Sequence, residues 1–369
     1  MSERVRHDDP VRVAVLGLGL IGGSVALRLA PDHEVLAWDV DPATRELATA
    51  AGLTVDPTLA GAPGTAPAAE VGVTSAPPTG DAAAAAGIGP TARTTPVAGR
   101  TADAGADTSP APDVTVLALP MAALPAALAT APGGTLTDVG SVKVPVLEAA
   151  RRAGVADRYV GGHPMAGIER TGFAASDPTL LDGAVWVLCL EPDTDLDRWL
   201  TVAELVTGAG CRVLPTTAAR HDEAQARISG LPHLLALALA VAGADGGPLA
   251  GALAAGSFRD GTRVAGSRPE LVAALCDGNA AALARVLDAT LARLDQARTA
   301  LRTGGTVHPL ATAGHAARRA WSEPVPMVAD TLDARAPGFR ADLRALGAAG
   351  GAVHAVHPDD TLHCRRPRQ

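Results

Sequence analysis

Val11-Arg-Val-Ala-Val-Leu-Gly17-Leu-Gly19-Leu-Ile-Gly22-Gly23-Ser24 joins a run of alternating valines to three spaced glycines. The β-branched valines predict a strand, and residues 25–30 after the glycines predict a helix. Gly17 permits a sharp turn, Gly19 leaves bare backbone for a pyrophosphate, and Gly22 lets the helix pack closely on the strand. Leu20 and Ile21 begin the helix, whose N-terminal N–H groups and partial positive charge favour phosphates. This pattern is typical of a dinucleotide-binding turn.

A second predicted strand, Glu34–Trp38, ends in an acid, Asp39. A glycine motif between a strand and a helix, followed by such an acid, is the context that dinucleotide binding requires. The Asp39 carboxylate would bind a ribose 2′-hydroxyl and repel a 2′-phosphate, so the expected cofactor is NAD. Asp41 is an alternative residue for this role, and a tight turn in another α/β protein is the alternative interpretation of the whole segment.

Composition excludes several classes of partner. The 369 residues are enough for two domains, and the net charge of −8 favours neither nucleic acid nor an anionic membrane. Residues 1–10 do not resemble a secretory signal, and the apolar run at 234–242 is too short to span a bilayer. The four cysteines lack metal-ligand spacing, so we expect no metal and a reducing, cytoplasmic location; they are Cys189, Cys211, Cys276 and Cys364.

Residues 11–215 are predicted to form the dinucleotide-binding α/β domain. Within it, residues 113–120 form a buried parallel strand, and Leu119 and Pro120 at its carboxyl end should lie at the cofactor. Residues 184–190 are expected to complete the sheet, and residues 211–214 to add an edge strand. The stretch 61–112 is rich in small residues and Pro without apolar periodicity, so we expect a disordered or loosely packed insertion.

Residues 216–303 carry apolar side chains at helical spacing and predict an all-helical domain. A Rossmann-type half followed by a helical half is a recurring dehydrogenase layout, in which the helical half forms substrate and dimer contacts. The long apolar surfaces predict a homodimer. Residues 304–369 form a short tail, in which 326–355 predict a strand–helix–strand unit without an assigned role.

Two polar clusters follow predicted strands of the first domain. Ser141 lies in the segment Asp138-Val-Gly-Ser-Val-Lys143, and His163 lies in Gly162-His-Pro-Met-Ala-Gly167. A histidine between a glycine and a proline at a strand end is placed for exposure into a cleft. Taken alone, Ser141 is equally well explained as a helix N-cap, and His163 as a buried structural residue.

Two more clusters lie in the helical half. His221 and Asp222 precede the segment Ser229-Gly-Leu-Pro-His233, in which Pro232 should kink a long helix. The loop segment Arg259-Asp-Gly-Thr-Arg263 carries two cations, which could bind an anionic substrate or only pair with Asp260.

Together and in this order, the glycine motif and these four clusters resemble the prephenate/arogenate dehydrogenase family. The resemblance extends over residues 11–303, apart from 61–112, and its most specific part is the pairing of His-Pro-Met-Ala-Gly with Leu-Pro-His. It implies NAD-dependent oxidative decarboxylation of prephenate to 4-hydroxyphenylpyruvate in tyrosine biosynthesis. Arogenate or an amino-substituted prephenate is an alternative substrate, and a non-catalytic dinucleotide-binding regulator is an alternative function.

The resemblance also implies residue roles. His163 would take the proton of the ring hydroxyl as hydride leaves, and Ser141 would help to orient that hydroxyl. Ser229 and His233 would line the substrate pocket with Asp222 on the same helix, and Arg263 would bind a substrate carboxylate. Neutral imidazole suits general-base chemistry, and guanidinium suits carboxylate binding. The chain departs from the family pattern at Gly230, where a histidine is usual, and in lacking a tryptophan after Ser267-Arg-Pro269.

Overall fold

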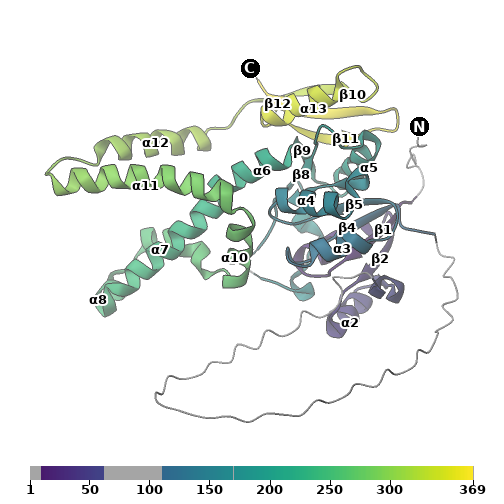
Figure 1. Cartoon of the computed structure of the whole chain (residues 1–369), viewed down its shortest axis with the longest axis horizontal. Coiled ribbons are helices and arrows are strands. Elements are labelled where there is room, and N and C mark those ends of the chain that lie inside the picture. The colour runs from purple at the N-terminus through teal and green to yellow at the C-terminus, as the bar shows by residue number, and fades with distance from the viewer. Residues whose placement is uncertain (1–9, 62–109, 169, 369) are drawn as a thin grey trace, which may run out of the picture. The chain divides into compact units, whose positions relative to one another are not determined.

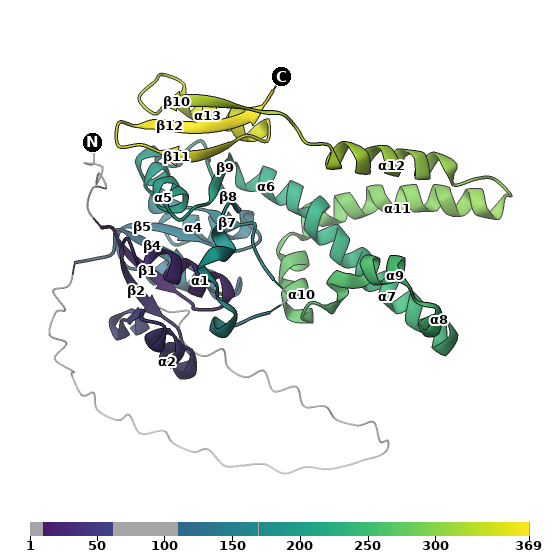
Figure 2. The same ribbon diagram turned by 180° about the vertical axis from the view of Figure 1, so that it is seen from behind.

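The computed structural model describes residues 10–61, 110–168 and 170–368 (Figures 1 and 2). Most of the predicted insertion at 61–112 lies outside these residues. The dinucleotide-binding half contains the following elements in chain order: β1 (Arg12–Leu16), α1 (Leu20–Leu29), β2 (Glu34–Trp38), α2 (Pro42–Ala50), β3 (Thr54–Val55), η1 (Pro57–Gly61), β4 (Val114–Leu117), α3 (Leu124–Thr130), β5 (Thr135–Asp138), α4 (Val144–Arg152), η2 (Ala156–Arg158) and β6 (Tyr159–Val160).

The first sheet is parallel throughout its described strands and has the order β3-β2-β1-β4-β5-β6. This order is that of the Rossmann fold, in which ligands bind beyond the carboxyl ends of the strands. The prediction of a Rossmann-type domain is therefore confirmed. Asp41 caps α2, because its carboxylate oxygens accept hydrogen bonds from the N–H groups of Ala43 and Thr44, each at 3.2 Å.

The glycine turn between β1 and α1 has the geometry that its spacing predicts. Gly17 has φ +91°, and a Cβ on Gly22 would lie 1.9 Å from the carbonyl oxygen of Gly17. Both positions therefore require glycine for steric reasons. A Cβ on Gly19, by contrast, would meet no atom within 4 Å. The backbone at Gly19, the N-cap of α1, thus borders open space where a phosphate could approach.

A second sheet follows and has the order β10-β12-β11-β9-β8-β7. Its elements and the connections between them, in chain order, are β7 (Gly162–Pro164), η3 (Phe173–Ala175), η4 (Pro178–Leu181), β8 (Val185–Cys189), α5 (Leu196–Gly208), β9 (Arg212–Thr216), β10 (Met327–Asp333), α13 (Phe339–Ala348), β11 (Ala352–Val356) and β12 (Thr361–Pro367). The strand–helix–strand unit in the tail is present, and β12 adds a further strand.

This second sheet corrects two predictions. The strand at 184–190 does not complete the first sheet, because β8 pairs with β7 and β9 instead. The strand at 211–214 is not an edge, because β9 pairs with β8 on one side and with β11 on the other. The C-terminal residues therefore extend the sheet. One buried cluster that includes Val13, Trp199, Val213 and Leu362 joins the two sheets into a common core.

The helical half runs from α6 to α12. Its elements are α6 (Ala218–Gln225), η5 (Ala226–Gly230), α7 (Leu231–Asp245), α8 (Gly247–Leu253), α9 (Gly256–Thr262), η6 (Arg263–Gly266), α10 (Pro269–Gly278), α11 (Ala280–Arg302) and α12 (His308–Ser322). The helices predicted within residues 216–303 are present. A small core around η5 and α11 holds them together through Ala226, Leu283 and Val286.

The α6–η5–α7 segment forms one continuous helix, Ala218–Asp245, whose 28 residues are long and apolar enough by length and composition to cross a membrane. The expectation from the sequence concerned only the apolar run at 234–242, which forms one part of this helix. The first turns of this helix carry the buried polar residues His221, Asp222 and Gln225. Farther along it, Leu235, Leu239 and Val241 are exposed.

A buried charge pair connects the first sheet to the second where the chain passes from β6 to β7. Lys143 and Asp138 are fully buried and form an ion pair. Lys143 Nζ also donates to the carbonyl oxygen of Gly162 at 2.6 Å, while Asp138 Oδ1 accepts from the N–H of Gly162 at 3.1 Å. Tyr159, the chain's only tyrosine, donates its hydroxyl to the same Oδ1 at 2.7 Å. Both polar groups of Gly162 are thereby fixed, directly before His163.

Removing one partner of this pair should be costly, because the other charge would remain buried without compensation. We expect Lys143→Met to lower the free energy of unfolding by about 3–5 kcal/mol, and Lys143→Met with Asp138→Asn to recover part of the loss. The control is Arg152→Met, because Arg152 forms a long, exposed ion pair with Glu148 at 3.9 Å and should cost about 0–1 kcal/mol. Urea denaturation measures all three. Equal losses for Lys143→Met and Arg152→Met would contradict the prediction.

Candidate active site

His163 lies on β7 at the end of a buried hydrogen-bonded chain of side chains. Its Nδ1 is 2.9 Å from Nε2 of His221, and Nδ1 of His221 is 2.7 Å from Oδ1 of Asp222. His163, His221 and Asp222 are exposed by 8%, 4% and 4%, so water competes little for these contacts. Asp222 thus orients the ring of His221, and His221 in turn orients the ring of His163.

The hydrogen-bond partners are used to assign the proton on each ring. The Asp222 carboxylate accepts from Nδ1 of His221, and Nε2 of His221 is assigned as the acceptor. Nδ1 of His163 then donates to His221, and the lone pair of His163 is on Nε2. Gln225 lies against the same ring: its amide nitrogen is 3.2 Å from His163 Nδ1, and its buried Oε1 has no hydrogen-bond partner among the described residues.

The environment keeps His163 neutral. Burial lowers the pKa of His163 well below its usual value of 6.5, and the nearby His221 and Lys143 lower it further. A histidine with a lowered pKa keeps a basic nitrogen throughout the neutral range. The lone pair on Nε2 is therefore ready to accept a proton.

Asp222 connects α6 to two other segments. Its Oδ1 and Oδ2 accept the backbone N–H groups of Lys143 and Val144, both at 2.8 Å, at the start of α4. The side-chain amide of Asn279 donates to its backbone carbonyl at 2.7 Å. Asp222 is predicted to contact substrate, but its carboxylate is occupied by these N–H groups and by His221. We therefore assign it a positioning role.

Ser141 lies in the loop between Asp138 and Lys143, and both of these residues are fixed next to His163. The N-cap of α4 is Lys143, and Asp222 supplies the capping oxygens, so Ser141 does not cap this helix. Ser141 is half-buried, and no hydrogen bond of its side chain is recorded among the residues described. Its hydroxyl is thus available to a ligand near His163.

Ser229 and His233 lie farther along the helix that carries His221. Ser229 is in η5, a π-helical turn, which is a distortion common at functional sites. His233 Nδ1 donates to the carbonyl oxygen of Ser229 at 2.9 Å, so its Nε2 is an acceptor. Arg263 is exposed on η6, which packs against α7 and α9. Asp222 thus belongs to the hydrogen-bonded chain that ends at His163. Ser229, His233 and Arg263 do not belong to it and lie farther along the helical half.

The predicted cofactor residues lie around the glycine turn. Asp39 Oδ2 accepts the N–H of Leu18 at 2.7 Å, which holds the acid beside the loop that contains Gly17 and Gly19. Arg45, the nearest cation on α2, uses its Nη1 on the carbonyl oxygens of Asp39 and Val40 and stacks over Trp38 at 4.4 Å. This arrangement presents the Asp39 carboxylate at the end of β2 and directs Nη1 of Arg45 to the backbone.

The remaining predicted residues follow the same edge. Leu20 and Ile21 form the half-buried first turn of α1, and Leu119 and Pro120 follow β4 directly. The open space at Gly19, the helix N-terminus and the acid at the end of β2 together fit a dinucleotide.

Lys143, His221 and Gln225 are site residues that the sequence did not assign. Lys143 and His221 occur in the quoted motifs. The nearby sequence does not show that Lys143 contacts Gly162, or that His221 contacts His163. Gln225 lies four residues after His221, so helical spacing places both on one face of α6. That spacing was a usable signal for Gln225.

Comparison with known proteins gives the family. The profile of the prephenate dehydrogenase nucleotide-binding domain matches residues 94–215, and that of the prephenate dehydrogenase dimerization domain matches residues 217–309. The prephenate dehydrogenase of Lactococcus lactis is 36% identical over 138 residues, which are 36% of this chain and 37% of that protein. The chain spans between 37% and 58% of the length of the three curated relatives that it matches.

Solved structures extend the likeness to nearly the whole chain. A crystal structure from Corynebacterium glutamicum, assigned as a prephenate dehydrogenase, is 32% identical with a TM-score of 0.73, covering 93% of this chain and 98% of that one. The Aquifex aeolicus prephenate dehydrogenase in complex with hydroxyphenyl propionate and NAD⁺ shares the fold at 20% identity and a TM-score of 0.65, covering 85% and 98%.

The two matched profiles together cover more than half of the chain, and they meet between β9 and α6, where the α/β half gives way to the helices. The resemblance seen in the motifs is thereby confirmed, and the chain belongs to the prephenate dehydrogenase family.

Proposed function

We propose that the chain catalyses the NAD-dependent oxidative decarboxylation of prephenate to 4-hydroxyphenylpyruvate in tyrosine biosynthesis. The observation that carries the proposal is the Asp222–His221–His163 chain, with hydrogen bonds of 2.7 and 2.9 Å, which leaves a neutral imidazole with its lone pair on Nε2. Membership of the family and the 36% identity to the Lactococcus lactis prephenate dehydrogenase support the choice of substrate.

In the proposed reaction, Nε2 of His163 accepts the proton of the ring hydroxyl as hydride leaves the same carbon. Bound NAD⁺ supplies the acceptor for that hydride. The ring carboxylate departs as carbon dioxide, and its bonding electrons complete the aromatic ring. Asp222 and His221 hold the base in one orientation, and Ser141 orients the hydroxyl. General-base catalysis of this kind contributes about 10²–10⁴-fold.

Arg263 and His233 are proposed to bind the substrate itself. Prephenate carries two carboxylates, and a guanidinium can bind one of them through two parallel hydrogen bonds. His233 offers an acceptor at Nε2 for a hydroxyl, because its Nδ1 is committed to Ser229.

NAD is the proposed cofactor because Asp39 lies at the end of β2 beside the glycine loop. Its carboxylate would accept the ribose 2′-hydroxyl and repel a 2′-phosphate. Arg45, which could otherwise bind that phosphate, has its Nη1 on two backbone carbonyls. The A. aeolicus relative contains NAD⁺.

A homodimer is proposed because large apolar side chains are exposed along α7 and α8 of the helical half. The exposed side chains on α7 and α8 include Leu235, Leu239, Val241, Leu249 and Leu253. Every residue of α12 is exposed, although a 15-residue helix without packing is marginal in water. The match of residues 217–309 to a dimerization domain supports a second copy as the occupant, rather than a lipid bilayer. The free thiols of the four cysteines support a cytoplasmic location.

The base is tested by His163→Asn, which keeps a hydrogen-bonding side chain but removes the basic nitrogen. We expect kcat for NADH formation with prephenate to fall about 10²–10⁴-fold with a smaller change in KM. In the unchanged chain, kcat/KM plotted against pH should fall on the acid side only below pH 6.5, because the pKa of His163 is lowered. Full turnover in the variant would contradict the assignment of His163 as the base. Parallel assays with arogenate test the alternative substrate.

The cofactor assignment is tested by Asp39→Asn. An amide can still accept the N–H of Leu18, so the loop should keep its shape while the negative charge is lost. We expect the ratio of kcat/KM for NAD to that for NADP to fall tenfold or more. Asp41→Asn is the matched control, because Asp41 caps α2 and should leave the ratio unchanged. An unaltered ratio in Asp39→Asn would remove Asp39 from cofactor selection.

The dimer is tested by Val241→Glu on α7, where the side chain is 63% exposed in a single chain. Sedimentation should give twice the 36.9 kDa chain mass for the unchanged protein and the single-chain mass for the variant. Leu47→Glu on α2 is the control, because Leu47 is 49% exposed but lies outside the helical half. Dissociation by both variants, or by neither, would contradict the proposed interface.

A further inference from the structure

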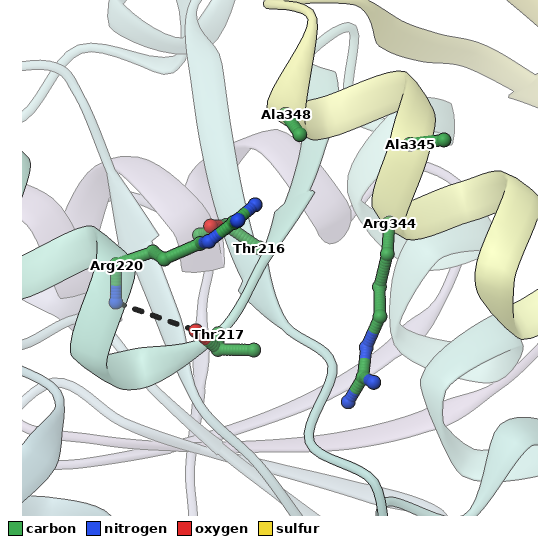
Figure 3. Close-up of a pocket in the computed structure, with 6 residues that line it drawn as sticks. All are labelled: Thr216, Thr217, Arg220, Arg344, Ala345 and Ala348. Carbon is green, nitrogen blue, oxygen red and sulfur yellow. Dashed lines mark hydrogen bonds between the residues drawn. The ribbon is translucent and has the colours of Figure 1, made fainter.

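A cavity of about 360 Å³ lies where the end of β9 and the first turn of α6 meet α13 (Figure 3). Its volume is within the range of small-molecule sites. The lining residues include none of the hydrogen-bonded chain around His163; they are Thr216, Thr217, Arg220, Arg344, Ala345 and Ala348.

Two guanidinium groups supply the hydrogen-bond donors of this cavity. The side chain of Arg220 extends from α6 toward Thr216 in Figure 3, and its guanidinium has no hydrogen bond or ion pair recorded with any residue that the structure describes. Arg344 donates from Nε and Nη2 to the carbonyl oxygen of Leu190, at 3.1 and 2.9 Å, which leaves Nη1. The lining residues, all of them described by the structure, include no acid.

Two charged side chains near the cavity, those of Glu191 and Arg340, bind backbone groups. Oε1 of Glu191 accepts the N–H of Ala218 at 2.6 Å, at the start of α6. Arg340, one turn from Arg344 on α13, donates to the carbonyl oxygens of Glu191 and Thr194 at 2.6 and 2.5 Å. Burial lowers the pKa of Arg340, and the positive charge of Arg344 lowers it further. The cavity therefore keeps the Arg220 guanidinium, the Arg344 Nη1 and the Thr216 hydroxyl as its uncommitted polar groups among the described lining residues.

These groups together match an oxyanion. Guanidinium binds carboxylate and phosphate oxygens through paired N–H donors, and the methyl groups of Ala345 and Ala348 offer an apolar surface beside them. We propose that the cavity between β9, α6 and α13 binds a small metabolite that carries a carboxylate or phosphate group, and that this ligand modulates the site at His163 through α6.

The route to His163 is short. Arg220 and His221 are consecutive residues of α6, and His221 lies 2.9 Å from His163 on the opposite, buried side. A ligand that draws Arg220 toward Arg344 would shift the first turn of α6, and with it the ring that orients His163. This modulation rests on the proposed function, whereas binding in the cavity does not.

Binding is tested by calorimetry on the full chain saturated with NAD, so that the glycine turn is occupied. Inorganic phosphate and sodium acetate are titrated separately, at constant ionic strength set with chloride. We expect one saturable site for at least one anion, and at least a tenfold loss of affinity in Arg220→Gln. Arg293→Gln on α11 is the control, because it removes an exposed arginine far along the chain from the cavity. Phosphate alone would identify a phosphate ligand, and acetate alone a carboxylate ligand.

The absence of binding in the unchanged chain, or equal binding in Arg220→Gln, would overturn the proposed site. An anion that binds at Arg263 would still bind in Arg220→Gln, so this variant distinguishes binding at Arg263 from binding in the cavity. For the modulation, we expect the bound anion to change kcat or KM for prephenate at least twofold in the unchanged chain and not in Arg220→Gln. An equal response of both would overturn the coupling. If prephenate is not turned over at all, the calorimetry still decides the binding site.

Discussion

The carboxylate of Asp222 holds the helical half to the α/β half at the point where the chemistry takes place. It accepts two backbone N–H groups at the start of α4 and the Nδ1 proton of His221, all within 2.8 Å. One acidic side chain thus caps a helix of the first half and orients the imidazole that contacts His163. Because these contacts share two oxygens, the orientation of the base depends on how the two halves of the chain dock.

The second fixed element is the backbone on which His163 lies. The N–H and the carbonyl of Gly162 are bound by Asp138 and Lys143, so β7 cannot slide along β8 without breaking a buried charge network. Buried ion pairs contribute little net stability compared with apolar replacements, but their geometry is specific. The ion pair of Lys143 with Asp138 therefore holds the backbone before His163 in place. The positive charge of Lys143 also lowers the pKa of His163, which keeps the ring neutral.

Much of the α/β half could be predicted because its signals are local. The alternating valines of β1 and the spaced glycines each act within a few residues, and the structure has them as expected. The neighbours of β9 could not be predicted, since its pairing with β11 joins segments far apart in the sequence. In the site, His163 was recognisable from its motif. The contact of His163 with Gln225 was not, because it depends on how α6 docks against β7.

The pairing of β9 with β11, which is far from it in the sequence, has a consequence for biosynthesis. On the ribosome, β9 emerges long before β11, and its hydrogen-bonding edge stays bare until β11 is translated. Unpaired strand edges are templates for aggregation, and domains fold as they emerge. The nascent α/β half can therefore reach its final state only after β11 has been translated. Termination before β11 would release a molecule with one open sheet edge.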